Sequence, residues 1–148
     1  MIPDLDERGN LPAGIHRASS WDTIHRRFGT NSHRIEMLDG LRIALYSLKQ
    51  AGCKKVYLGG SFVTNKQHPN DYDCCWDANG VDESRLDKIF LDFSPSGRQR
   101  QKFIFKGEFV LSSIIEGATN TPFLDFFQTD RETLGRKGIV ELNLEELL

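Results

Sequence analysis

Apolar residues in the first third of the chain recur at helical spacing. Between residues 32 and 51 they follow one another at steps of three and four positions, at Ile35, Leu38, Leu41, Leu45 and Leu48. Because this spacing places side chains along one stripe of a helix, it predicts an amphipathic helix over 32–51. Asn31 suits the start of this helix as a capping residue, and Gly52 suits its end.

Shorter apolar runs between turn-forming residues predict the other elements. Further helices are expected over 21–28, 82–91 and 123–131, and strands over 54–58, 71–76, 103–113 and 138–144. Ser94-Pro95-Ser96-Gly97 is expected to be a loop, followed by a basic segment from Arg98 to Lys102. This element order predicts an α+β fold, a mixed β-sheet flanked by helices.

Prolines and glycines near the start of the chain interrupt regular structure. Pro3, Gly9, Pro12 and Gly14 all lie within residues 1–18, which we therefore expect to form an extended N-terminal arm. The remaining residues, 19–148, are long enough for a single domain with a core of its own.

Composition is that of an ordinary globular protein. Hydrophobic residues make up 39% and charged residues 27% of the 148 residues, and the net charge is −2, so no overall basic field attracts nucleic acid. The chain has no apolar run of the roughly 18 residues that a membrane helix needs. The three cysteines, Cys53, Cys74 and Cys75, fit neither a disulfide framework nor a zinc spacing. We therefore expect a cytoplasmic protein without a membrane partner.

Candidate chemistry gathers around two short motifs. Gly59-Gly60-Ser61 ends an apolar strand, and Asp71-Tyr72-Asp73 opens the next. Alternate strand residues share a face, so the two aspartates are expected side by side, where their carboxylates repel each other. A divalent cation such as Mg²⁺, or Mn²⁺ in its place, relieves that repulsion. The glycine backbone offers N–H groups to phosphate, so the pair of motifs predicts metal-assisted chemistry on a nucleoside triphosphate.

The fuller pattern resembles a known superfamily. Gly60-Ser61-Phe62-Val63-Thr64-x-Lys66-x-x-Pro69-Asn70-Asp71-x-Asp73 is similar to the motif of the nucleotidyltransferases, which share the DNA polymerase β-like fold. It resembles most a group of small bacterial and phage nucleotidyltransferase-like proteins. The likeness continues at Leu11-Pro12-x-Gly14-Ile15-His16, Phe126-Phe127-Gln128 and Lys137-Gly138-Ile139-Val140. It covers nearly the whole chain and implies the minimal nucleotidyltransferase fold.

The resemblance also implies roles for individual residues. Asp71 and Asp73 would bind the metal. Gly59, Gly60 and Ser61 would bind the triphosphate, with Lys66 between the motifs as a further phosphate ligand. A third carboxylate, acting as metal ligand and base, is expected on the strand after the intervening helix. Glu108 is the first choice for it, and Asp125 is the alternative, ranked lower because Thr121-Pro122 favours a helix there.

The implied reaction transfers a nucleoside monophosphate to a hydroxyl of RNA, for example a tRNA-like acceptor, or of a protein. Small stand-alone members of the superfamily serve in toxin–antitoxin pairs and in phage defence, which implies a cognate partner protein. The alternative is a catalytically degenerate relative that binds a nucleotide or a partner protein. The basic cluster of Arg98, Arg100 and Lys102 is either a solvated loop or a docking point for nucleic acid or the triphosphate.

Overall fold

A five-stranded sheet in the order β1-β7-β2-β3-β4 organises the computed structural model, which describes residues 2–148. Its strands are β1 (Gly14–Arg17), β2 (Lys55–Gly59), β3 (Tyr72–Trp76), β4 (Gly107–Leu111) and β7 (Gly138–Asn143). β1 pairs with β7, and β3 with β4, in parallel, whereas β2 runs antiparallel to both β3 and β7. The α+β class and the mixed sheet with flanking helices are thereby confirmed.

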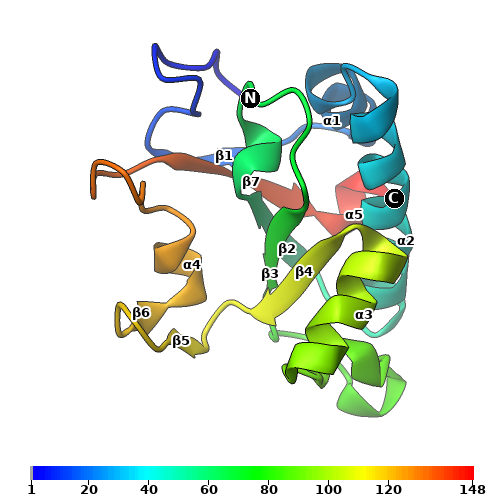
Figure 1. The fold of residues 1–148 in the computed structure, drawn as a ribbon. Coiled ribbons are helices and arrows are strands. Elements are labelled where there is room, and N and C mark those ends of the chain that lie inside the picture. Colours follow the sequence, from blue (N-terminus) through cyan, green and yellow to red (C-terminus); the bar gives the residue numbers. More distant parts are fainter. Residues whose placement is uncertain (1) are drawn as a thin grey trace.

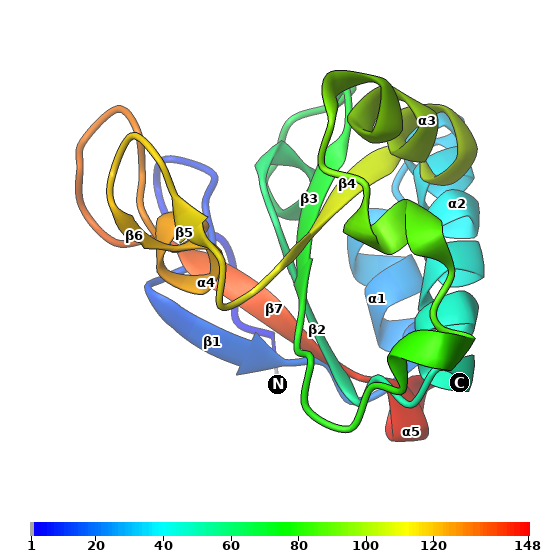
Figure 2. The same cartoon turned by 90° about the horizontal axis from the view of Figure 1, so that it is seen from below.

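One face of the sheet is covered by helices (Figures 1 and 2). They are α1 (Trp21–Phe28), α2 (Ser32–Gln50), α3 (Pro95–Phe105) and the short α5 (Leu144–Leu147). The predicted cap of α2 is confirmed, because Asn31 Oδ1 accepts from Arg34 N at 2.9 Å. Ser20 caps α1 in the same way, with its Oγ accepting from Thr23 N at 3.1 Å. None of the helices among residues 2–148 combines the length and the apolar character needed to cross a membrane.

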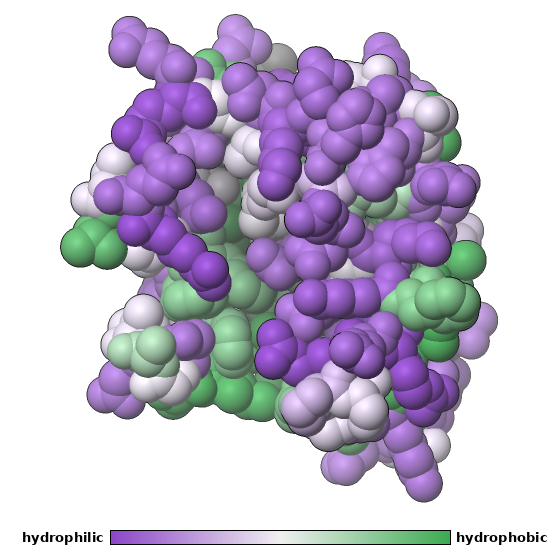
Figure 3. Space-filling model, viewed as in Figure 1, coloured by the Kyte–Doolittle hydropathy of each residue, from purple (hydrophilic) through white to green (hydrophobic). Residues whose placement is uncertain are grey.

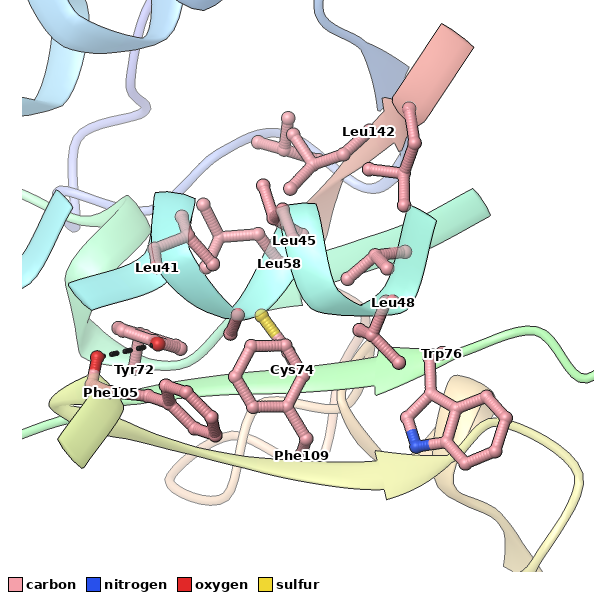
Figure 4. Packing of buried hydrophobic residues seen from close by; sticks show 14 of the residues in the cluster. Leu41, Leu45, Leu48, Leu58, Tyr72, Cys74, Trp76, Phe105, Phe109 and Leu142 are labelled. Atoms are coloured by element: carbon pink, nitrogen blue, oxygen red, sulfur yellow. Dashed lines mark hydrogen bonds between the residues drawn. The ribbon is translucent and has the colours of Figure 1, made fainter. Parts of the chain in front are cut away.

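The hydrophobic core lies between α2 and the sheet (Figure 4). Because strand side chains alternate between faces, Tyr72, Cys74 and Trp76 of β3 point into this core, whereas Asp73 and Cys75 leave the opposite face. The buried leucines of α2 lie over them, and each contributes about 1.5–3 kcal/mol to stability. In addition, the Tyr72 hydroxyl donates to Phe105 O at 2.7 Å, which ties the end of α3 to the sheet.

Residues 95–105 form the helix α3, so our prediction of a loop over 94–97 is wrong. The strand predicted over 103–113 exists, but it begins only at Gly107. Ser94 Oγ accepts from Gly97 N at 3.1 Å, so the serine caps a helix that Pro95 opens. Lys106 ends it in the left-handed conformation, with φ at 68°, and β4 begins one residue later. α3 is therefore the crossover between the parallel strands β3 and β4.

The predicted helix over 82–91 is also wrong in type. The segment forms two short 3-10 helices, Glu83–Arg85 and Lys88–Leu91. Each has its own aspartate cap, because Asp82 accepts from Ser84 N and Asp87 from Ile89 N, both at 3.0 Å. Two caps so close together favour two separate turns over one continuous helix.

The other face of the sheet is covered only in part. Residues 112–137 cross it as β5 (Ile115–Glu116), β6 (Thr121–Pro122) and the single-turn helix α4 (Phe123–Phe126), shown apart from the other helices in Figure 2. The helix predicted over 123–131 is thus only one turn long. Beyond it the chain reverses, with Leu134 at a positive φ and Thr129 bridged to Arg136.

The N-terminal segment that we expected to be an arm contributes a strand to the sheet. β1 lies within it and pairs with β7 at the edge, so residues 14–17 are part of the sheet. Within the same segment, Leu11 and Ile2 are buried in the core. Met1, the first residue of the expected arm, lies outside the described residues.

Candidate functional site

Three strands bring the predicted site residues into one row. Asp73 of β3 is the register partner of Gly59 on β2 and of Glu108 on β4. Because pairing partners share a face, both carboxylates leave the sheet on the side opposite to the core. The site therefore stands on the partly covered face, next to the segment that carries α4.

The Gly-Ser turn lies against Asp73. Gly60 has φ at +80°, and a β-carbon built on it would stand 2.7 Å from Asp73 Oδ2. A side chain at this position would therefore strike the carboxylate and also strain the backbone. Ser61 follows at the start of a short 3-10 helix, Ser61–Val63. The glycine thus allows the backbone to approach the carboxylate closely.

A buried arginine holds the loop that follows the turn. Arg34 of α2 is only 3% exposed and donates to Phe62 O at 2.8 Å, Thr64 O at 2.9 Å and Lys66 O at 2.7 Å. Burial lowers its pKa, because the charged guanidinium loses its contact with solvent. Our sequence reasoning missed Arg34, although the spacing of Leu38, four positions later, places it on the apolar stripe of α2, where an arginine requires a partner.

Two cations of α3 reach the acidic row, the name we give to Asp71, Asp73 and Glu108. Arg98 Nε donates to Glu108 Oε1 at 2.9 Å, and Lys102 Nζ lies 3.2 Å from Asp71 Oδ2 and 3.8 Å from Glu108 Oε1. Arg98 and Lys102 are four residues apart, so the helix places them on one face. The pKa of Arg98 is raised by its hydrogen bond to Glu108, and that of Lys102 by its hydrogen bond to Asp71.

Asp73 differs from its two acidic neighbours. Among residues 2–148, it has no lysine, arginine or histidine nitrogen within ion-pair distance. Asp71, in contrast, is paired with Lys102, and Glu108 is paired with both Arg98 and Lys102. Burial is the largest cause that raises the pKa of Asp73 to about 6, and the charges of Asp71 and Glu108 act in the same direction. The charges of Arg131 and Lys137 offset only part of this rise. The site thus contains one carboxylate that is held beside like charges without a cation of its own.

A cavity of about 390 Å³ opens beside these carboxylates. Figure 3 shows it as a hydrophobic hollow between the α4 segment and the α3 side of the molecule, rimmed by hydrophilic side chains. Asp73, Glu108, Arg98 and Arg131 border it. Its apolar wall is formed by Phe93, Val110, Ile114, Phe123, Phe126 and Phe127. Phe126 and Phe127 belong to the stretch Phe126-Phe127-Gln128, where the resemblance continues, but it assigned them no role. The other wall residues come from segments that the resemblance did not include.

Two predicted residues lie apart from this row. Lys66 is exposed and lines a second hollow together with Arg27 and Arg34, away from the residues of the cavity. Asp125, the alternative third carboxylate, has a side chain that is 56% exposed and stands 3.9 Å from Arg136. It does not line the cavity, whereas Glu108 does. The geometry therefore favours Glu108 as the neighbour of Asp73.

The carboxylates fit a divalent cation only in combination with a ligand. Across residues 2–148, no three acidic, histidine or cysteine side chains are close enough together to form a ready metal site. Their oxygens are nevertheless the donors that Mg²⁺ prefers, and Mg²⁺ is commonly held by one or two carboxylates plus substrate phosphates. The repulsion on Asp73 is the kind that such a cation relieves.

The fold and the site define an α+β protein with an acidic row and an aromatic cavity on the partly covered face of its sheet. The chain belongs to a family of unknown function, DUF6932, whose sequence profile matches residues 3–143. Neither a curated protein nor a solved structure matches the chain.

Proposed function

We propose that the protein is a nucleotidyltransferase that moves a nucleoside monophosphate from a nucleoside triphosphate to a hydroxyl of RNA or of a protein. The observation that carries this proposal is the placement of Asp73 between Gly59 and Glu108, at the edge of an aromatic cavity. The Gly60 turn against the same carboxylate supports it, because a phosphate chain needs close access to backbone N–H groups there.

In this proposal, Asp71, Asp73 and Glu108 hold Mg²⁺ or Mn²⁺ together with the phosphates. The cation neutralises charge on the triphosphate. The backbone of Gly59, Gly60 and Ser61 binds the outer phosphates. Electrostatic positioning of this kind supplies most of the catalysis in phosphoryl transfer.

Glu108 is the proposed base. The acceptor hydroxyl oxygen forms a bond to the α-phosphorus, the bond from that phosphorus to the bridging oxygen breaks, and pyrophosphate leaves. The hydroxyl proton passes to Glu108, which must first be released from Arg98. The nucleobase and ribose of the substrate occupy the cavity, where the rings of Phe126 and its aromatic neighbours provide faces for stacking.

Lys66 lies outside the cavity and keeps its proposed phosphate role only if its exposed side chain reaches the triphosphate from the neighbouring loop. The tRNA-like or protein acceptor and a toxin–antitoxin or phage-defence role are part of the same proposal, and they rest on the resemblance of the motif. The cytoplasm suits it, because the three cysteines are free and buried.

A second candidate is a degenerate relative that binds a nucleotide or a partner without turnover. It is favoured by the two ion pairs to α3, since Arg98 and Lys102 occupy carboxylate oxygens that an active site would give to a metal. The nucleotide-binding form of this relative also predicts a nucleotide in the cavity, and turnover distinguishes it from the transferase. The partner-binding form predicts no nucleotide there.

The test is isothermal titration of the protein with ATP, GTP, CTP and UTP, each in Mg²⁺ and in EDTA. We expect metal-dependent binding of at least one nucleotide, abolished in the double variant Asp71→Ala/Asp73→Ala and retained in Asp125→Ala, whose carboxylate lies outside the cavity. Pyrophosphate release in the presence of pooled RNA or protein acceptors would then support the transferase. Binding without release would favour the degenerate relative that binds a nucleotide. No binding by folded protein would refute the transferase and leave only the relative that binds a partner protein.

A further inference from the structure

The ion pairs between α3 and the acidic row point to two further residues that could bind the triphosphate, both outside the two motifs. We propose that Arg98 and Lys102 are polyphosphate-binding residues, which the carboxylates of Glu108 and Asp71 hold in the free protein and release when a triphosphate enters with its metal. The inference rests on the proposed function, since it assigns these side chains to the triphosphate of the same site.

Arg98 and Lys102 both lie where a bound triphosphate would pass. Both project from one face of α3 toward the sheet, and Lys102 is shared between Asp71 and Glu108, at 3.2 and 3.8 Å. Arg98 borders the cavity itself. A triphosphate lying between the Gly60 turn and the aromatic wall would therefore pass within reach of both side chains.

The balance of charge also bears on the ligand. Three carboxylates face two cations, and a divalent cation bound to the carboxylates would stand beside Arg98 and Lys102 as a like charge. A triphosphate removes this conflict, because its oxygens accept from the guanidinium and the ammonium once they leave the carboxylates. Metal and triphosphate should therefore bind together, and the metal alone should bind weakly.

The side chains of Arg98 and Lys102 can move while α3 stays in place. Their side chains are 55% and 45% exposed, and ion pairs of this kind are weak. α3 is anchored elsewhere, by the buried Gln101, which donates to Ile89 O and accepts from Phe109 N, both at 2.7 Å. Release therefore requires only new side-chain rotamers.

Removing the two cations should change the affinities for metal and for polyphosphate in opposite directions. In the double variant Arg98→Gln/Lys102→Gln, Mn²⁺ alone should bind at least tenfold more tightly, because the carboxylates lose their internal cations. The 1:1 complex of Mn²⁺ with inorganic tripolyphosphate should bind at least tenfold more weakly, because the phosphates lose two ligands. Arg100→Gln is the matched control: it removes one charge from the same helix, but its side chain is exposed and makes no ion pair among the described residues.

The experiment measures Mn²⁺ binding by electron paramagnetic resonance and binding of the complex by titration calorimetry. Lys102→Gln alone, with smaller shifts in the same directions, serves if the double variant does not fold. Unchanged Mn²⁺ affinity in the variants, or equal shifts in Arg100→Gln, would overturn the inference while nucleotide binding by the wild type stayed intact. Failure of the proposed function is a different result, in which the wild type binds none of the four nucleotides.

Discussion

Asp73 and Glu108 are register partners across the parallel strands β3 and β4, and both side chains leave the same face of the sheet. Neighbouring strands lie about 4.8 Å apart, so the fold itself keeps the two carboxylates close. Glu108 is compensated by Arg98, but Asp73 has no ion pair within the described part of the chain. The pairing of two strands thus imposes a repulsion that the free protein does not relieve.

Burial of Asp73, together with this repulsion, predicts that Asp73→Asn stabilises the free protein at neutral pH. The pKa of Asp73 rises from its ordinary value of 3.8 to about 6 on folding, so ionisation costs stability as the pH climbs from about 4 through 6. The neutral variant escapes that cost. At pH 7.5 in EDTA it should unfold with a free energy about 1–3 kcal/mol above the wild type.

Urea denaturation at pH 7.5 and at pH 4 measures the difference, which should nearly vanish at the lower pH because the wild-type carboxyl is then protonated. Asp125→Asn is the control, since its carboxylate is exposed and should change stability by less than about 0.5 kcal/mol. A variant no more stable than the wild type at pH 7.5 would show that Asp73 is not under this strain.

Gly60→Ala should damage both stability and binding. An alanine at φ of +80° costs about 1–3 kcal/mol, and its β-carbon would press on Asp73 Oδ2. Gly80→Ala is a matched control, because Gly80 has φ at +84° and lies against Gly52 and Lys54, remote from the acidic row. Both variants should lower the midpoint of thermal unfolding, but only Gly60→Ala should lose metal-dependent nucleotide binding in calorimetry. Equal binding by the two would separate the turn from the site.

The elements that follow a regular period were predictable from the sequence. The apolar stripe of α2 and the runs of β2, β3 and β7 each carry their own signal, and so do the caps at Ser20 and Asn31. β1 carries no such signal: its residues are mostly exposed, and it forms a strand only because β7 lies beside it. Pairing between distant segments is not encoded in local spacing.

α3 shows how a local misreading changes the site. Pro95 and Gly97 are turn residues by composition, yet here proline opens a helix, and glycine is required because a β-carbon would stand 2.2 Å from Asp92 Cγ. When the basic segment is taken as a loop, the directions of its side chains cannot be predicted. As a helix, it aims Arg98 and Lys102 at the carboxylates, and leaves Arg100 aside. The motif predicted the carboxylates of the acidic row. Which basic side chains face them depends on how α3 is rotated about its axis, and the motif does not include α3.

Phe126→Ala should weaken binding of a nucleotide without affecting its phosphates. The Phe126 ring lines the cavity, and the Arg131 guanidinium lies 5.2 Å from its centre. Stacking on an aromatic ring is worth about 1–3 kcal/mol per base, so the affinity for the best nucleotide should fall about 5- to 150-fold. Binding of tripolyphosphate with Mn²⁺ should stay as in the wild type.

The control is Phe103→Ala on α3, where the ring is 79% exposed and outside the cavity, and titration of both ligands should give wild-type values. Parallel losses for nucleotide and tripolyphosphate would instead indicate that Phe126 supports the fold of the site.

Arg34→Met should loosen the loop after the Gly-Ser turn. The guanidinium donates to carbonyls of Phe62, Thr64 and Lys66, and methionine fills the volume but leaves these buried acceptors without donors. We expect a loss of about 2–4 kcal/mol in the free energy of unfolding. Arg42→Met is the control on the same helix: its guanidinium lies over the rings of Trp21 and Tyr46 at 5.5 and 5.7 Å, an exposed contact worth about 0.5–1 kcal/mol. Urea denaturation measures both losses, and hydrogen exchange of the amides of residues 61–66 locates the change. If exchange there stayed slow in Arg34→Met, the loop would owe its position to Phe62 in the core rather than to the arginine.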